Sequence, residues 1–171
     1  MSYCSFCRDL PKDNLHKIYH DFHYGVRISS NEALFERLVL EINQAGLSWD
    51  LMLKKQNNFK VAFDNYNIKK IAKYTENDIN RLCADAGIIR NRLKINAVIH
   101  NANVISQLIE QHGTFENWIQ IHHPLQLIEW VKLFKRTFKF VGGEIVNEFL
   151  MSTAYLSGAH DVNCEKYSVI I

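Results

Sequence analysis

The stretch Leu40-Glu41-Ile42-Asn43-Gln44-Ala45-Gly46-Leu47-Ser48-Trp49 decides the fold, because it joins a helical pattern to a turn and an aromatic residue. Apolar residues recur here at the three- and four-residue spacing of one helix face, and Glu41 falls on that face between Leu38 and Ala45. An ionised carboxylate on a buried face is costly unless a donor or a cation pairs with it. Two interpretations follow. Glu41 lies at the edge of the face, half exposed or salt-bridged, or it lines a pocket with Trp49 that suits a flat, cationic ligand.

Start and stop signals divide the rest of the chain into helices. Ser29, with Glu32 three residues later, predicts a capping box, and Gly46 predicts the end of that helix. Further caps and stops are predicted at Ser48, Asn67, Thr75, Gly87 and Gly113. The expected helices cover 31–45, 48–63, 67–73, 76–85, 90–111, 124–135 and 143–156. We expect the helix at 90–111 to be the central core helix, because one stripe of it contains Leu93, Ala97, Asn101, Val104 and Leu108. The sequence therefore predicts an all-α fold.

Bulk composition indicates one globular domain over residues 1–171, with 47% hydrophobic and 22% charged residues. Seven glycines and two prolines favour long helices over turn-rich sheets. No apolar run has the length of a membrane span, and Met1-Ser2-Tyr3-Cys4 begins no signal-peptide core. Four cysteines without a disulfide framework indicate a reducing compartment. We therefore expect a monomeric, cytoplasmic protein with no membrane partner.

The two ends of the chain carry a possible metal site. His160-x-x-x-Cys164 has the spacing that places both side chains on one face of a helix or tight loop, which is half of a zinc site. Cys4 and His20 are the natural candidates for the other two ligands. Cys7 is an alternative ligand, and each cysteine could instead be a buried free thiol. A redox role for Cys4-x-x-Cys7 is disfavoured because no βαβ pattern surrounds it.

A basic segment near the C-terminus is a candidate nucleic-acid contact. The net charge of +2 is too small to diagnose DNA binding, but Lys135, Arg136 and Lys139 cluster without an acid. Gly142 follows them, where backbone amides at the start of the next helix could approach a phosphate. An ordinary helix–helix corner with solvated lysines is the alternative. A second basic cluster contains Arg90, Arg92 and Lys94.

Several stretches together resemble a known family. They are Tyr19-His20-Asp21 with Tyr24-Gly25, Glu41 to Trp49, Leu53-Lys54-Lys55, Asp85-Ala86-Gly87-Ile88-Ile89-Arg90, Phe138-Lys139-Phe140-Val141-Gly142, and His160-x-x-x-Cys164. In this order they resemble the 3-methyladenine DNA glycosylase I family across nearly the whole chain. The resemblance implies an all-helical DNA repair enzyme with a helix-hairpin-helix element and a structural zinc joining the termini. It places the zinc ligands at Cys4, His20, His160 and Cys164, and the base pocket at Tyr19, Glu41 and Trp49.

The chain departs from the family pattern around this pocket. Phe6 and Tyr24 stand where the family usually has tryptophan, so aromatic rings are kept there, and we expect both to contact the base. Asn147 and Met151 replace the more usual Tyr and Gln. An altered base preference would be consistent with these changes.

The resemblance implies a mechanism in which the damaged nucleotide of double-stranded DNA is flipped out of the helix. Tyr19 and Trp49 would stack on the cationic 3-methyladenine, and Glu41, the candidate catalytic residue, would accept its hydrogen bonds. No lysine occurs in the pocket motifs, so base release without strand cleavage is expected. Two rivals stay open: a non-catalytic module that binds damaged DNA, and a zinc hydrolase, which would need an open metal position.

Overall fold

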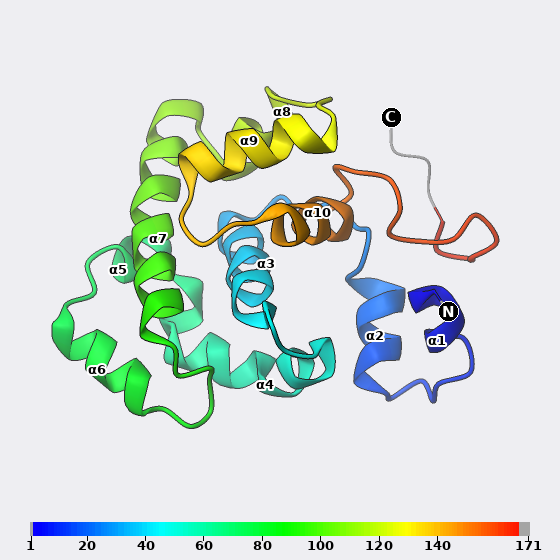
Figure 1. Ribbon diagram of the computed structural model, residues 1–171, viewed down its shortest axis with the longest axis horizontal. Coiled ribbons are helices and arrows are strands. Elements are labelled where there is room, and N and C mark those ends of the chain that lie inside the picture. The colour runs from blue at the N-terminus through cyan, green and yellow to red at the C-terminus, as the bar shows by residue number, and fades with distance from the viewer. Residues whose placement is uncertain (1, 168–171) are drawn as a thin grey trace.

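The computed structural model describes residues 2–167, and those residues form α-helices and one 3-10 helix with no β-strand (Figure 1). The predicted all-α class is confirmed. The elements are α1 (Tyr3–Cys7), α2 (Leu15–Phe22), α3 (Asn31–Gln44), α4 (Trp49–Ala62), η1 (Asp64–Tyr66), α5 (Ile68–Ile71), α6 (Glu76–Ala84), α7 (Arg92–His112), α8 (Phe115–Gln120), α9 (Leu127–Thr137) and α10 (Gly143–Ser152).

Most predicted helix starts depend on the capping residues that the sequence indicated. Ser48 and Asn67 accept backbone hydrogen bonds as N-caps, and Thr75 forms the expected capping box with Asp78. The box predicted at Ser29 is wrong by one residue. Ser30 is the N-cap of α3, because its hydroxyl accepts the Ala33 amide at 3.2 Å.

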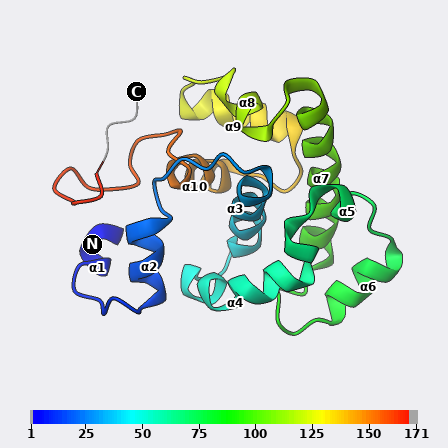
Figure 2. The same cartoon turned by 180° about the vertical axis from the view of Figure 1, so that it is seen from behind.

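Helix α3 lies in the middle of the fold, and its apolar side chains are almost fully buried (Figures 1 and 2). It packs against α4, α7, α8 and α10, and Leu34, Phe35, Leu38 and Ile42 belong to the main hydrophobic core. Because α3 is covered on several sides, even charged residues on its inner faces, Arg37 and Glu41, are buried. This arrangement is what buries Glu41.

Helix α7 is the long helix expected from the sequence, and its buried face overlaps the predicted stripe. Ala97 and Asn101 of that stripe are buried, but Leu93, at its start, is 71% exposed. The buried face also includes the apolar residues Ile95, Val98, Ala102 and Ile105. Two overlapping stripes of a long helix are both plausible from periodicity, and the packing partners α5, α6 and α8 decide between them.

Three short helices, α1, α2 and α8, were not predicted, and each has fewer than nine residues. Helix α10 ends at Ser152, four residues before the predicted end. Ala154 takes a positive φ of 59° there, and the amides of Tyr155 and Leu156 donate back to the Leu150 carbonyl.

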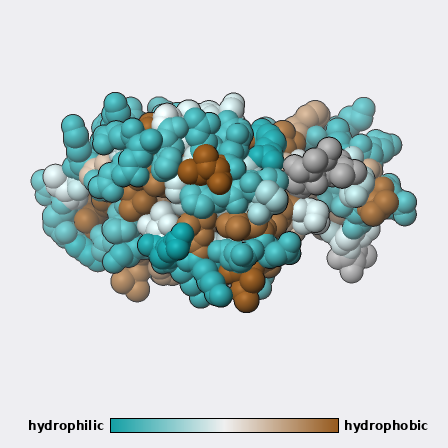
Figure 3. All heavy atoms as spheres, turned by 90° about the horizontal axis from the view of Figure 1, so that it is seen from above, coloured by the Kyte–Doolittle hydropathy of each residue, from teal (hydrophilic) through white to brown (hydrophobic). Residues whose placement is uncertain are grey.

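The surface and the termini frame the site. The face in Figure 3 is mainly hydrophilic, with apolar atoms in small groups. Helices α1 and α2 lie beside the segment that follows α10, which brings the two ends of the chain together (Figures 1 and 2). None of the helices within residues 2–167 has both the length and the apolar character of a membrane span.

Candidate functional site: an aromatic cavity, a basic hairpin and a four-residue metal cluster

A cavity of about 700 Å³ opens between α2, the end of α3, the start of α4 and the start of α10. This volume lies in the range of small-molecule sites. Tyr19, Glu41 and Trp49, which the sequence grouped into one pocket, all line it, and Tyr24 and Gly142 line it too. The structure therefore brings four of the five predicted base-contacting residues to one place, and the cavity borders the basic segment that ends at Gly142.

Glu41 is buried and uncompensated within this cavity. Its side chain is 4% exposed, and none of the described residues donates a hydrogen bond to its carboxylate. Burial raises the pKa of Glu41 to about 8, with Arg37 opposing the shift and Glu148 adding to it. The edge-of-helix interpretation of Glu41 is wrong. A buried carboxylate without a donor is a group that a cationic or hydrogen-bond-donating ligand would stabilise.

Arg37 lies one helical turn before Glu41, but its guanidinium is engaged elsewhere. It donates to the Tyr19 hydroxyl at 3.0 Å and to the backbone carbonyls of His23 and Ser152. These bonds fix Tyr19 in the cavity wall and tie α3 to the segment after α2. Arg37 thus stabilises the aromatic wall and leaves the carboxylate of Glu41 free.

Aromatic rings form one wall of the cavity. The Tyr19 ring centroid lies 5.0 Å from Trp49 and 5.6 Å from Tyr24. The indole Nε1 of Trp49 is buried, and residues 2–167 offer it no hydrogen-bond partner. Burial raises the pKa values of Tyr19 and Tyr24 far above the usual range, so both phenols are neutral. Such a wall offers electron-rich ring faces for stacking and cation–π contacts.

Tyr3, which the sequence reasoning missed, occupies the place in the wall that we expected for Phe6. Phe6 is 45% exposed and does not line the cavity, whereas Tyr3 does. The Tyr3 hydroxyl contacts His16 Nδ1 at 3.1 Å, and its ring meets the Tyr24 ring edge to face at 5.5 Å. The prediction that Phe6 lines the base pocket is therefore wrong. Helix α1 presents position 3 to the cavity, whereas the ring at position 6 packs beside Tyr3 and His16.

The end of α9 and the link to α10, residues 135–142, are called the basic hairpin here, and this hairpin leads into the cavity lining at Gly142. Lys135, Arg136 and Lys139 are all exposed, and Gly142 is the N-cap of α10. Gly142 makes no side-chain cap, and a Cβ added there would meet nothing within 4 Å. The space beside the Gly142 Cα is therefore open, and the backbone amides in the first turn of α10 are candidates to bind an anion.

Asn101 holds this hairpin in place. Its buried side chain accepts the Lys139 amide at 2.8 Å and donates to the Lys139 carbonyl at 3.0 Å. Position 101 fell on the predicted stripe of the long helix, but a role as a clamp could not be read from it. The clamp fixes the backbone at Lys139 and leaves its ammonium in solvent.

The second basic cluster is not a free cationic surface. Lys94 is buried, and its ammonium donates at 2.8 Å to the carbonyls of Asn43 and Ala45 at the end of α3. Arg92 pairs with Glu76. Two of the three cations in this cluster are therefore used within the protein, and Lys94 supports the cavity rim by fixing the end of α3.

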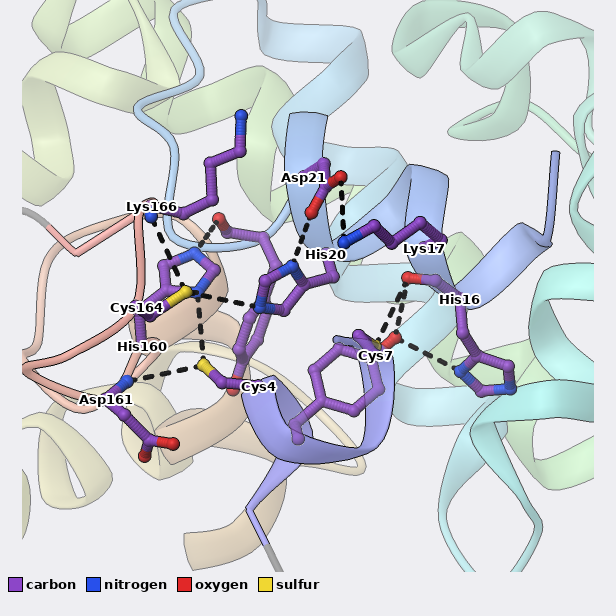
Figure 4. Close-up of polar contacts among 12 residues, drawn as sticks. Cys4, Cys7, His16, Lys17, His20, Asp21, His160, Asp161, Cys164 and Lys166 are labelled. Atoms are coloured by element: carbon purple, nitrogen blue, oxygen red, sulfur yellow. Dashed lines mark hydrogen bonds and ion pairs between the residues drawn. The ribbon is translucent and has the colours of Figure 1, made fainter. Parts of the chain in front are cut away.

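Four predicted metal ligands converge at the joined termini (Figure 4). The ligand atoms of Cys4, His20, His160 and Cys164 all lie within 4.8 Å of one another. Individual separations are 3.6 Å from Cys4 Sγ to His160 Nδ1 and 3.7 Å from Cys164 Sγ to His20 Nε2. Tetrahedral zinc with ordinary Zn–S and Zn–N distances places sulfur and nitrogen about 3.6 Å apart. The four residues fit a metal of this kind.

The groups around the cluster orient it for metal binding. His20 Nδ1 contacts Asp21 at 2.7 Å, and His160 Nε2 contacts the Tyr24 carbonyl at 2.9 Å, so the other nitrogen of each ring faces the centre. The Asp161 amide donates to Cys4 Sγ at 3.3 Å. Cys7 lies outside the cluster, with its thiol directed to the His16 carbonyl. The alternative ligand set with Cys7 is therefore not assembled.

Comparison with known proteins decides the family. The sequence model of the Methyladenine glycosylase family matches residues 10–129. The chain is 34% identical, over 92% of its length, to DNA-3-methyladenine glycosylase 1 of Escherichia coli, of which it covers 94%. The chain belongs to the methyladenine glycosylase family.

Solved structures agree with this assignment. The chain is similar to 3-methyladenine DNA glycosylase I from Staphylococcus aureus, a structure concerned with 3-methyladenine recognition, with a TM-score of 0.84, 28% identity and coverage of 96% of this chain and 97% of that one. A variant of 3-methyladenine DNA glycosylase I in complex with 3-methyladenine gives a TM-score of 0.85 at 28% identity, with the same coverage of 96% and 97%. The resemblance inferred from the motifs is confirmed at the level of family and fold.

Proposed function

We propose that this chain releases 3-methyladenine from alkylated double-stranded DNA and leaves the strand intact. The observation that carries the proposal is Glu41, a buried carboxylate without a donor in an aromatic cavity. A cavity of this kind suits a flat, positively charged base, and membership of the family supports the same substrate.

The base must leave the duplex before it can enter this cavity. Tyr19 and Trp49 would stack on its faces, and Tyr24 and Tyr3 would close the N-terminal side. Glu41 would accept its hydrogen bonds and complement its charge. The same contacts disfavour neutral bases, because a neutral base leaves the buried carboxylate without a cation.

The chemistry requires little from the protein beyond this arrangement. Methylation at ring position 3 gives adenine a positive charge, so the C1′–N9 bond breaks with its electron pair going to the base, whose charge is cancelled. Water then adds to C1′ and loses a proton to solvent. An ionised Glu41 also favours the positive charge that develops on the sugar. No lysine lines the cavity among the described residues, which supports a mechanism without a Schiff base or strand cleavage.

The hairpin between α9 and α10 would bind the DNA backbone. Lys135, Arg136 and Lys139 supply exposed cations, and the backbone amides that follow Gly142 at the start of α10 would supply donors. These contacts carry no base information, so they would anchor any sequence while the cavity selects the base. A monomer has all of these parts.

Zinc bound by Cys4, His20, His160 and Cys164 would have a structural role. Four protein ligands leave no coordination position for water or substrate, which argues against a zinc hydrolase. The bound metal would join α1 and α2 to the segment after α10, and those helices carry Tyr3 and Tyr19 into the cavity wall. Reduced cysteines and a DNA substrate both fit the expected cytoplasmic location.

The proposal is tested by incubating the purified protein with methylated duplex and identifying the released bases. The expected result is free 3-methyladenine together with an intact abasic strand. Tight binding of the damaged duplex without base release would instead support a non-catalytic relative. Strand scission without added base or heat would indicate an amine nucleophile and contradict the proposed chemistry.

A further inference from the structure

The cavity contains two acidic groups that the mechanism above does not use, Glu144 and Glu148, both on α10. Glu144 is exposed, whereas Glu148 is half-buried and lines the same cavity as Glu41 on α3. The Tyr24 hydroxyl donates to Glu148 Oε2 at 3.3 Å. The described residues give the other oxygen, Oε1, no hydrogen bond. One oxygen is therefore held in place while the other stays available to a ligand.

The electrostatic surroundings of Glu41 and Glu148 are not balanced by bases. Burial is the main cause that raises the pKa values of both Glu41 and Glu148, and Glu148 raises that of Glu41 further. No lysine or arginine lines the cavity among the described residues. The nearby Arg37 is bonded to Tyr19 and to backbone carbonyls. The cavity thus holds buried acidic groups that no base in its lining pairs with, and a cationic ligand would favour their ionised forms.

We propose that Glu148 is a specificity-determining residue that, together with Glu41, selects purines with a positive charge over neutral purines of the same shape. The inference rests on the proposed function and deepens it. Glu41 and Glu148 offer acceptors from two helices, so the preferred ligand carries charge delocalised over its rings and N–H donors on more than one edge. Tyr24 acts as a positioning residue, because its hydroxyl orients the Glu148 carboxylate.

A purely structural role for Glu148 makes different predictions. If the carboxylate only anchors the Tyr24 ring, Glu148→Gln should be harmless, since the amide oxygen still accepts the same hydrogen bond. If its charge selects the ligand, Glu148→Gln should keep the fold and lose discrimination. The unfolding temperature should stay equal or rise, because a buried acid is replaced by a neutral amide.

The decisive experiment compares two probes of equal shape and different charge. The cation is 3,9-dimethyladeninium, and the neutral analogue is 3,9-dimethyl-3-deazaadenine, which has carbon in place of the charged nitrogen. Binding to the purified, metal-loaded protein would be measured by calorimetry for wild type, Glu148→Gln and Tyr24→Phe. Glu110→Gln, which removes an exposed acid far from the cavity lining, is the charge-matched control.

We expect Glu148→Gln to weaken binding of the cation by about 5- to 30-fold and binding of the neutral probe by less than about twofold. Tyr24→Phe should reduce discrimination by about two- to threefold, and Glu110→Gln should leave it unchanged. Equal weakening of both probes, or no weakening of either, would overturn the proposal. Failure of the proposed function has a separate signature, which is charge discrimination by wild type without release of 3-methyladenine from methylated DNA.

Discussion

The metal cluster and the aromatic cavity both bury polar groups, but they differ in how those groups are partnered. At the cluster, both histidines have a second hydrogen bond that fixes the ring, and Cys4 accepts a backbone amide. In the cavity, the described part of the chain gives the Glu41 carboxylate no donor and gives Trp49 Nε1 no acceptor. A satisfied shell around converging ligands suits a permanent structural site, whereas unsatisfied groups suit a site completed by a transient ligand.

The largest expected effect lies on the cluster side. Cys164→Ser removes one of four ligands, so zinc should be lost and the free energy of unfolding should fall by at least about 3 kcal/mol. Metal analysis and thermal unfolding on the same samples check both effects. Cys7→Ser is the matched control, since Cys7 is buried beside the cluster without joining it. Stoichiometric zinc in a Cys4/Cys164 double mutant would contradict the ligand assignment.

On the cavity side, Trp49→Ala should weaken binding of free 3-methyladenine by roughly 1–3 kcal/mol, because stacking on an aromatic ring contributes about that much per base. Titration calorimetry measures the loss directly. Trp49→Phe keeps a ring and should recover most of the affinity. Equally tight binding of the free base by Trp49→Ala and by wild type would contradict this account, since the indole would then have no part in the site.

The buried acid Glu41 should make the stability of the protein depend on pH. Because burial raises the pKa of Glu41 to about 8, the folded protein binds an extra proton between the ordinary carboxyl range and pH 8. The contribution of Glu41 to stability is therefore full at acidic pH and is lost as pH rises toward 8. Glu41→Gln should be more stable than wild type by about 1–3 kcal/mol at pH 8 and nearly equal to it at pH 5. Urea unfolding at both pH values tests this, and a constant difference between the two proteins would exclude the shift.

The smallest expected effects belong to the hairpin. Lys135→Ala, Arg136→Ala or Lys139→Ala should weaken duplex binding for any sequence and reduce the salt slope by roughly one per lost contact. Binding isotherms at several salt concentrations give the slope. Lys69→Ala is a suitable control, because Lys69 is exposed on α5, away from the hairpin. Unchanged slopes in all three hairpin variants would place the DNA anchor elsewhere.

The sequence predicted the cavity residues on α3 because Glu41 interrupts an apolar helix face, and that signal is local. It also grouped four metal ligands from the two ends, since cysteine and histidine have few other roles at that spacing. Glu148 and Tyr3 could not be found in this way. Which face of α10 meets the cavity depends on its packing against α3 and α9, and the orientation of the five-residue α1 depends on α2. Such long-range packing also explains why Leu93 is exposed and why Phe6 does not line the cavity.

The most direct test of the central claim is single-turnover release of 3-methyladenine from methylated duplex by wild type and by Glu41→Gln. Removing a buried charge that pairs with a cationic base costs on the order of 2–5 kcal/mol. The rate should therefore fall by roughly 30-fold to several thousand-fold. Thermal unfolding of both proteins shows that the loss is chemical, because Glu41→Gln should be at least as stable as wild type. Equal rates of base release in the two folded proteins would contradict the role assigned to Glu41.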